Sequence, residues 1–291
     1  MPQVELAGLL SYIAQLEQGR ASRVLVLAAS NLDTEMLPAL YEHCRALGRS
    51  ARLDVVLHGR GGVVNAARRI ALLLRGHAEH LAFIVPFHCQ SSATLLTLCG
   101  DEIIAGELSL FSPIDPQLSG QDGAAFSGLD IQRFGDMAEQ WFGLDAAEAR
   151  QQSLALLCNS VFPPTLTAFY RTMLELEQIG EELLAYQLPA QSAAQRKQIV
   201  GQLMSAYHSH NYALTGDEMA GLGLRVRRDA QVEGAAWEIS KLICATVGGG
   251  LRDGADGPWN DTLFATRDSV TVRARQPGSM RTLWSSQRLS S

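Results

Sequence analysis

The chain is poor in lysine and in positive charge. Lys197 and Lys241 are its only lysines, and its 24 basic side chains are outnumbered by 30 acidic ones, which gives a formal net charge of −6 at pH 7. Proteins that bind nucleic acid neutralise phosphates with a basic patch, and no excess of basic residues is available here. The composition therefore disfavours nucleic acid as a partner, and we expect none.

Cysteine is scarce, and long hydrophobic runs are absent. The five cysteines, at positions 44, 89, 99, 158 and 244, include no C-x-x-C spacing, so neither a disulfide framework nor a zinc site is indicated.

No run approaches the length of a membrane-spanning helix, and residues 1–18 lack the basic start and apolar core of a secretion signal. We expect a cytoplasmic protein with no membrane span, no metal and no cofactor.

The first half of the sequence predicts an α/β fold. Of the 291 residues, 47% are hydrophobic, which is enough to bury a full core. Short apolar runs alternate with helical patterns, an order that predicts a parallel sheet with right-handed crossovers and helices on its faces. The strands are expected at 23–28, 54–57, 82–85, 102–106 and 108–111, and the helices at 4–17, 34–47 and 63–74.

The second half of the sequence is mainly helical. Residues 119–128 are rich in glycine and serine and predict a surface loop, after which helical periodicity recurs. Helices are expected at 145–157, 164–179 and 193–207, and a shorter capped helix at 215–223. We divide the chain into an N-terminal helix (1–19), an α/β domain with a helical extension (20–247) and a partly flexible, glycine-rich tail (248–291).

Two strand-to-helix turns carry the residues of greatest chemical interest. The first contains Gly59-Arg60-Gly61-Gly62, whose glycines allow a sharp turn and leave backbone N–H groups uncovered. The second, from Pro86 to Thr94, places the pair Ser91-Ser92 where a helical pattern opens. A serine beside a glycine-rich turn supplies a nucleophile next to an oxyanion hole. The alternative is that Ser91 only caps the helix, since serine is a favoured N-cap.

These turns belong to a set of motifs in a fixed order. The motifs are Leu57-His58-Gly59-Arg60-Gly61-Gly62, Val85 to Leu95, Asp101-Glu102-Ile103, Ser112-Pro113-Ile114-Asp115-Pro116-Gln117, and His210-Asn211-Tyr212 with Leu222-Gly223-Leu224. Together they resemble the serine dehydrogenase proteinase family, which belongs to the Clp peptidase/crotonase superfamily and is related to signal peptide peptidase A. The resemblance covers roughly residues 20–228. It implies a Clp peptidase/crotonase-like fold with a parallel sheet, crossover helices and a helical C-terminal half.

The resemblance also implies roles for individual residues. It places the nucleophile at Ser91 and the oxyanion hole at the backbone N–H groups of Gly62 and Ser92, with Gly61 beside them. Where the family has a proline before its paired glycines, this chain has Arg60, and Ser92 replaces a family glycine. The implied activity is that of a serine peptidase acting on a peptide or protein substrate. The relatives assemble as rings or trimers, so we expect a homo-oligomer.

No motif identifies the general base. A serine hydroxyl needs a histidine or lysine within hydrogen-bond reach to act as a nucleophile at neutral pH. Relatives of the Clp peptidase type use a histidine and an aspartate after the serine, and signal peptide peptidase A relatives use a lysine. In this chain the candidates for the base are His210, Lys197 and His88, and Asp115 is a candidate to orient it.

Two further hypotheses stay open. The replacement of the family proline by Arg60 and of two family glycines by Ser92 and Ala93, together with the absence of an obvious base, favours a catalytically inactive member that serves as an oligomeric assembly or peptide-binding module. The second hypothesis is acyl-thioester chemistry of the crotonase type, in which the same pair of amides binds an enolate.

Overall fold

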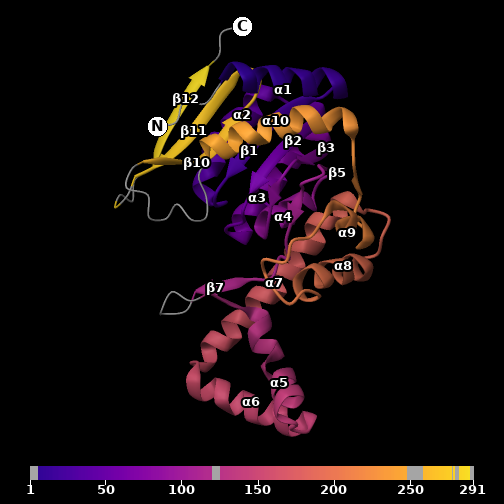
Figure 1. Ribbon diagram of the computed structural model, residues 1–291, viewed down its shortest axis with the longest axis vertical. Coiled ribbons are helices and arrows are strands. Elements are labelled where there is room, and N and C mark those ends of the chain that lie inside the picture. The colour runs from indigo at the N-terminus through magenta and orange to yellow at the C-terminus, as the bar shows by residue number, and fades with distance from the viewer. Residues whose placement is uncertain (1–5, 120–124, 248–257, 277, 279–281, 289–291) are drawn as a thin grey trace.

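The computed structural model describes residues 6–119, 125–247, 258–276, 278 and 282–288. In these residues a mixed sheet lies between two layers of helices, and a helical arm projects from one end of this α/β body (Figure 1). The predicted fold class, with a parallel sheet, crossover helices and a largely helical second half, is confirmed.

The sheet is parallel at its centre and antiparallel at one edge, in the strand order β12-β11-β10-β1-β2-β3-β5-β9. The parallel strands are β1 (Arg23–Ala29), β2 (Ser50–Gly59), β3 (Ala78–Val85), β5 (Glu102–Ala105) and β9 (Val226–Arg227), and the antiparallel strands are β10 (Trp259–Ala265), β11 (Ser269–Arg275) and β12 (Leu283–Arg288). The short strand β4 (His88–Cys89) pairs with the end of β2 and with β6 (Leu110–Phe111). Because β4 lies off the main strand order, the sheet divides at the end of β2, next to the two turns at residues 59–62 and 86–94.

Helices cover both faces of the sheet. One face is covered by α1 (Leu6–Arg20) and α10 (Ala230–Thr246). The other face carries α2 (Leu37–Leu47), which follows the 3-10 turn η1 (Thr34–Met36), together with α3 (Val64–Gly76), α4 (Ser92–Thr97), α7 (Pro163–Gln187), α8 (Ala193–Ser205) and α9 (Gly216–Gly221). Because parallel strands need crossover connections, α2 and α3 join successive strands along one face.

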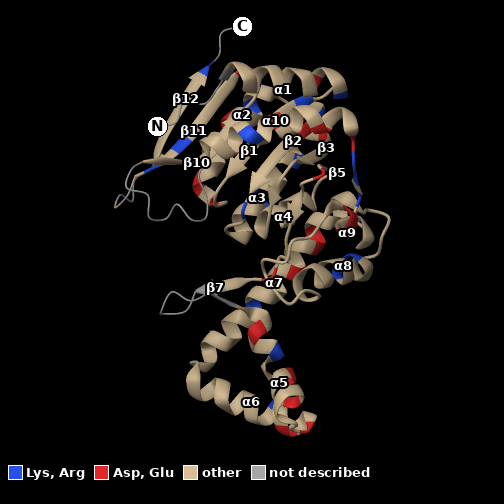
Figure 2. Cartoon of the chain, in the orientation of Figure 1, with Lys and Arg blue, Asp and Glu red and all other residues tan. Residues whose placement is uncertain are grey.

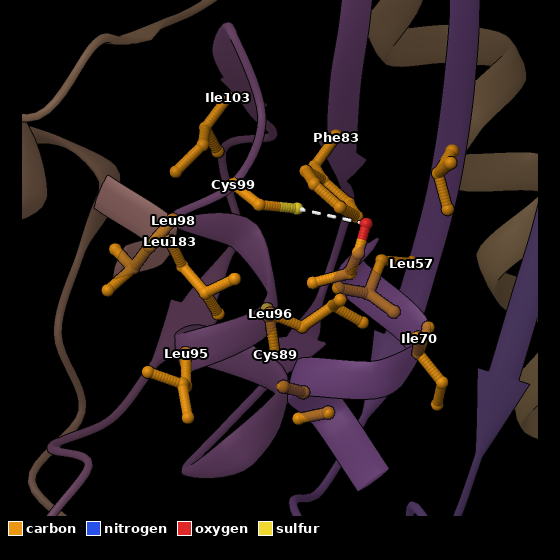
Figure 3. Packing of buried hydrophobic residues seen from close by; sticks show 14 of the residues in the cluster. Leu57, Ile70, Phe83, Cys89, Leu95, Leu96, Leu98, Cys99, Ile103 and Leu183 are labelled. Atoms are coloured by element: carbon orange, nitrogen blue, oxygen red, sulfur yellow. Dashed lines mark hydrogen bonds between the residues drawn. The ribbon is translucent and has the colours of Figure 1, made fainter. Parts of the chain in front are cut away.

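Side-chain alternation in β2 sorts the core into two clusters. Leu53, Val55 and Leu57 face α3, α4 and α7, whereas Val56 faces α1 and α10, because successive side chains of a strand point to opposite sides of the sheet. Figure 3 shows the first of these clusters, in which leucines of α4 and α7 pack with Phe83 of β3. The fully buried α4 is thus held in the core, and its first residue follows Ser91 directly.

A helical arm extends away from the α/β body. It consists of α5 (Gly128–Phe142), α6 (Ala146–Ser160) and the first half of α7, and Figure 1 shows it projecting below the sheet. Large apolar side chains are exposed along this arm, namely Trp141, Phe142, Leu154, Leu156, Phe162, Tyr170 and Leu174. The expected helical extension is therefore present, with much of its apolar surface uncovered.

The expectation of a surface loop over residues 119–128 was wrong at both ends of that stretch. Residues of β7 (Gln117–Ser119) pair antiparallel with β8 (Ala125–Ser127), and α5 begins directly after this hairpin. Residues 120–124 lie outside the described part of the chain. The many glycines hid the strand pattern, because glycine is depleted in strands.

The C-terminal segment contributes three strands, which the expectation of a partly flexible tail over 248–291 had missed. Strand β10 adds antiparallel to β1, and β11 and β12 follow outward. Two charged residues, Asp261 of β10 and Arg273 of β11, lie inside the sheet. Arg273 is fully buried, and its guanidinium forms ion pairs with Asp33 at 2.8 Å and with Asp261 at 2.7 Å. Charged residues at buried positions concealed the strand alternation from a hydrophobicity pattern. Residues 248–257 are outside the described part.

Charges are dispersed over the surface, and the described helices are of moderate hydrophobicity. In the view of Figure 2, Lys and Arg are interspersed with Asp and Glu along the body and the arm. Among the described residues, no helix combines the length and the apolar character needed to cross a bilayer.

We predict that Arg273→Met lowers the free energy of unfolding by about 3 kcal/mol, because it leaves the buried Asp261 and the partly buried Asp33 with Arg275 as their remaining arginine of β11. The measurement is the urea concentration at the midpoint of unfolding, compared at an unchanged m-value. Arg267→Met is the matched control, since the Arg267 side chain is 64% exposed and only 4.0 Å from Glu17, and it should change stability by less than about 0.5 kcal/mol. Equal effects of the two substitutions would contradict a stabilising role for the buried cluster.

Candidate active site

The turn after β2 and the turn after β4 are in direct contact. The Gln90 N–H donates to the Gly59 carbonyl at 2.9 Å, and Ser92 Oγ donates to the Gly62 carbonyl at 2.7 Å. Both turns stand at the carboxyl ends of parallel strands, where open α/β sheets bind their ligands. The two turns that the sequence singled out therefore form one site.

The first turn requires glycine at two positions. Gly61 has φ 115° and Gly62 has φ 139°, values that side chains rarely adopt. A Cβ on Gly61 would lie 2.9 Å from Ser91 Cβ, and a Cβ on Gly62 would lie 2.3 Å from backbone atoms of Leu32. The backbone of this turn thus runs against Ser91 with no side chain between them.

Ser91 has a strained backbone, and its side chain does not cap the helix that follows. Its φ of 51° and ψ of −122° lie in a region that non-glycine residues rarely occupy. Its N–H donates to Ser112 Oγ at 2.7 Å, but its side chain makes no capping hydrogen bond to α4. The geometry therefore does not support the alternative that Ser91 serves as a side-chain helix cap.

Backbone amides surround this serine. Within the described part of the chain, the N–H groups of Gly61, Gly62 and Ser92 donate to no protein acceptor. Ser92 begins α4 without a positive φ, so replacing a family glycine here costs no backbone strain. Unpaired amides beside a serine can bind an oxyanion that forms on a carbonyl under attack.

Asp115 and His210, far apart in sequence, form a hydrogen-bonded pair. His210 Nδ1 lies 2.8 Å from Asp115 Oδ1, and the Asp115 carboxylate is buried. A carboxylate only accepts, so Nδ1 of the imidazole carries the proton. In the neutral ring the other nitrogen, Nε2, is then an acceptor that can take a proton from a hydroxyl.

Hydrogen bonds keep the Asp115 carboxyl ionised. Burial alone raises the pKa of this group, but the hydrogen bonds from His210 and Ser127, the charge of the His210 imidazole and a bond from Gln117 together lower it below its usual value. The Ser127 hydroxyl donates at 2.6 Å and the Gln117 amide at 2.8 Å, both to Oδ2. Asp115 is therefore a fixed negative charge at neutral pH.

One short segment links this pair to Ser91. Ser112 accepts the Ser91 N–H, and Asp115 follows Ser112 by three residues, a distance of at most about 11 Å along an extended chain. The loop that carries His210 is held against the same segment, because Phe111 and Leu214 exchange two backbone hydrogen bonds of 2.9 Å. The structure thus gathers Ser91, Asp115 and His210 around residues 111–115.

The other candidates for the base are engaged elsewhere. Lys197 is exposed on α8, and its Nζ lies 3.6 Å from Glu177. His88 Nε2 accepts from Arg60 at 3.2 Å, so the proton of the neutral ring is on Nδ1 and no acceptor nitrogen remains. Burial and the Arg60 charge lower the pKa of His88 to about 4, and burial, His88 and Arg60 lower the pKa of neighbouring His58 to about 3.

Sequence reasoning did not assign roles to three residues that contact these candidates. Ser112 holds the Ser91 amide, and Gln117 and Ser127 hold the Asp115 carboxylate. Ser112 and Gln117 lie inside the motif at residues 112–117, so the sequence marked this segment as part of the candidate site. Ser127 lies at the end of a glycine-rich stretch and carried no such signal.

Comparison with protein families agrees with the resemblance found from the motifs. Residues 34–135 match the ClpP-like SDH-type serine proteinases, and this segment contains both turns, Ser91 and Asp115. The predicted resemblance is thus confirmed over this segment.

Two curated relatives come from Methanocaldococcus jannaschii. The uncharacterized protein MJ0137 is 28% identical over 68% of this chain and 60% of its own length, and the uncharacterized protein MJ1495 is 26% identical over 67% of this chain and 58% of its own length. The chain therefore spans about 60% of the length of these relatives.

Among solved structures, two mutants of the 1510-N membrane-bound stomatin-specific protease are similar. A lysine-to-alanine mutant in complex with a substrate peptide aligns with a TM-score of 0.43 and 13% identity over 72% of this chain and 77% of its own. A serine-to-alanine mutant aligns with a TM-score of 0.38 and 15% identity over 67% of this chain and 72% of its own.

The strain at Ser91 predicts that Ser91→Gly raises the free energy of unfolding by roughly 1 kcal/mol, because glycine adopts positive φ without penalty. Ser92→Gly is the control. It removes the hydrogen bond to Gly62 and places glycine in a helix, so it should lower the free energy of unfolding by about 1–2 kcal/mol. The denaturation midpoints of both variants provide the measurement, and a destabilised Ser91→Gly protein would contradict strain at this residue.

Proposed function

We propose that this chain, whose residues 34–135 match the ClpP-like SDH-type serine proteinases, is a serine peptidase that hydrolyses peptide or protein substrates. Ser91 is its nucleophile, His210 its general base and Asp115 the group that orients the base. The backbone amides of Gly62 and Ser92, with Gly61 beside them, form its oxyanion hole.

The observation that carries this proposal is the Asp115–His210 pair, held on the segment that also binds the Ser91 backbone. The sequence had offered several possible bases without a reason to choose between them. His210 is the one whose Nδ1 is bound by a buried carboxylate, which leaves Nε2 as an acceptor. Lys197, by contrast, is exposed and beside Glu177.

The proposed reaction follows from these contacts. His210 Nε2 accepts the hydroxyl proton while Ser91 Oγ attacks the substrate carbonyl, and the negative charge of Asp115 stabilises the imidazolium that results. The carbonyl oxygen gains negative charge and is bound by the unpaired amides of Gly62 and Ser92. His210 then returns the proton to the leaving amine, and water releases the acyl group by the same steps in reverse.

The strained geometry of Ser91 supports a functional role for this residue. A backbone in an unfavourable region is retained only when the surrounding structure holds it there, and such residues concentrate at active sites. Here the positive φ holds the residue against Gly61, since a Cβ on that glycine would lie 3.2 Å from Ser91 Oγ. A serine that served only the fold would gain stability in an ordinary conformation.

We further propose that the protein is a cytoplasmic homo-oligomer. The exposed apolar residues of the arm, among them Trp141 (77% exposed) and Phe162 (72% exposed), form a surface that a second copy would cover. All five cysteines are free, and three of them are buried, as suits a reducing compartment.

Replacing the nucleophile tests the peptidase proposal directly. Ser91→Ala should reduce hydrolysis of an unstructured protein such as casein by roughly 10³-fold and abolish labelling by a fluorophosphonate. His210→Gln and Asp115→Asn should also be strongly impaired, because the base or its orientation is lost. Lys197→Gln is the control and should retain wild-type activity.

Other outcomes would replace this proposal. Activity that survives Ser91→Ala would exclude Ser91 as the nucleophile, and loss of activity in Lys197→Gln would assign the base to lysine. Peptide binding by the wild-type protein without turnover would instead support a catalytically inactive binding or assembly module.

The oligomer proposal predicts a change in size on disrupting the arm. Phe142→Glu should shift the protein to a smaller species in sedimentation velocity, because a charge on an exposed apolar patch opposes its burial. Arg171→Glu, at an exposed arginine of the same arm, is the control and should leave the sedimentation coefficient unchanged. A wild-type protein that sediments as a monomer at micromolar concentration would contradict the proposal.

A further inference from the structure

The N-cap residue of α5, Ser127, and a residue of its second turn, Arg133, contact the candidate active site. We propose that Ser127 and Arg133 are positioning residues. They hold Asp115 and the loop of His210 in the relative positions that proton transfer requires, so that the start of α5 positions the base. This inference rests on the proposed function. It adds residues that lie outside the nucleophile, the base and the oxyanion hole.

The Ser127 hydroxyl has two tasks at once. It accepts the Leu129 N–H at 3.1 Å as the N-cap of α5, and it donates to Asp115 Oδ2 at 2.6 Å. A hydroxyl has a single proton, so that proton is committed to the carboxylate. The backbone N–H of Ser127 also donates to Asp130 at 2.9 Å, which completes a capping box and fixes the residue at the start of the helix.

This arrangement orients the Asp115 carboxylate toward His210. Oδ1 accepts from the imidazole, and Oδ2 accepts from Ser127 and from Gln117. Without the hydroxyl, Gln117 alone would hold Oδ2, and the carboxylate could rotate about its last side-chain torsion. Rotation would move Oδ1 from the position that fixes the imidazole and its tautomer.

Arg133, six residues further along α5, holds the loop that carries His210. One of its nitrogens donates to the Ser205 carbonyl at 2.8 Å, and another donates to His208 Nδ1 at 2.9 Å. His208 precedes His210 by two residues. Two nitrogens of the Arg133 guanidinium are thus used for contacts to the segment 205–208.

Ser127 and Arg133 act on the two partners of the Asp115–His210 hydrogen bond. Ser127 fixes the acceptor of the Asp115–His210 bond, and Arg133 fixes the segment 205–208 that leads to its donor. Ser127 is the N-cap of α5 and Arg133 lies in its second turn, so a displacement of α5 would disturb the donor and the acceptor together. A misplacement of about 1 Å in a catalytic group can lower a rate by roughly 100-fold.

Four variants at Ser127 and at a matched cap separate positioning from helix capping. Ser127→Ala removes the cap and the donor, Ser127→Thr keeps both, and Ser127→Asp keeps a good cap but has no proton to donate at neutral pH. Ser192→Ala is the control, because Ser192 caps α8 in the same type of capping box and, among the described residues, its hydroxyl hydrogen-bonds to Gln195 alone.

We expect Ser127→Ala and Ser127→Asp to lower kcat about tenfold with KM changed by less than about twofold, and Ser127→Thr to restore wild-type kcat. Ser192→Ala should leave kcat unchanged. Arg133→Gln should also lower kcat, while Arg171→Gln, at an exposed arginine of α7, should not. Wild-type kcat in Ser127→Asp, or equal losses in Ser127→Ala and Ser192→Ala, would overturn positioning by Ser127. Wild-type kcat in Arg133→Gln would overturn positioning by Arg133.

A readout independent of turnover distinguishes failure of this inference from failure of the proposed function. The His210 Nδ1–H should give a downfield proton resonance, identified by its loss in His210→Gln. It should broaden by exchange in Ser127→Ala and in Arg133→Gln but not in the two controls. A protein that shows this pattern without hydrolysing any substrate would retain the positioning role and lose the peptidase proposal. An unchanged resonance in Ser127→Ala and Arg133→Gln would remove the positioning role whatever the activity.

Discussion

The close approach of two crossover turns is the constraint on which the candidate site depends. Gly62 packs so tightly against Leu32 that a Cβ would lie 2.3 Å from its backbone, and Gly61 is equally close-packed against Ser91. Ser92 then joins the turns by donating to the Gly62 carbonyl. These contacts hold Ser91 at a positive φ and leave nearby amides unpaired. The strained serine and the unpaired amides thus have a common origin in a backbone packed too closely for side chains.

Burial of carboxylates imposes a second constraint, which the fold meets in the same way at two distant places. A buried carboxylate must be hydrogen-bonded or paired with a cation, because its desolvation otherwise costs several kcal/mol. In the antiparallel part of the sheet, Arg273 satisfies Asp33 and Asp261 and joins the C-terminal strands to the start of η1, the turn that precedes α2. In the site, Asp115 accepts hydrogen bonds from three side chains, those of His210, Ser127 and Gln117. The first cluster serves stability, and the second suits proton transfer.

The arm combines two properties that are seldom found together in one element. Its outer surface exposes large apolar side chains, whereas Ser127, the N-cap of α5, contacts Asp115 and Arg133 of α5 contacts the segment 205–208. The exposed apolar surface therefore continues along the chain from the residues that contact Asp115 and the loop of His210.

The sequence by itself indicated the parallel α/β core and the two turns, because hydrophobic periodicity and glycine or serine at a strand end are local signals, and its motifs marked Ser91, Asp115 and His210 as candidates. It did not reveal strands β10 to β12, since Asp261 and Arg273 lie buried in them as ion partners of each other and Arg273 also pairs with the distant Asp33. It also left the base undecided among His210, Lys197 and His88. Only the tertiary structure paired His210 with Asp115, 95 residues apart, and brought Ser127 to the same carboxylate. Contacts of this kind depend on where distant segments pack, and no spacing along the chain encodes that.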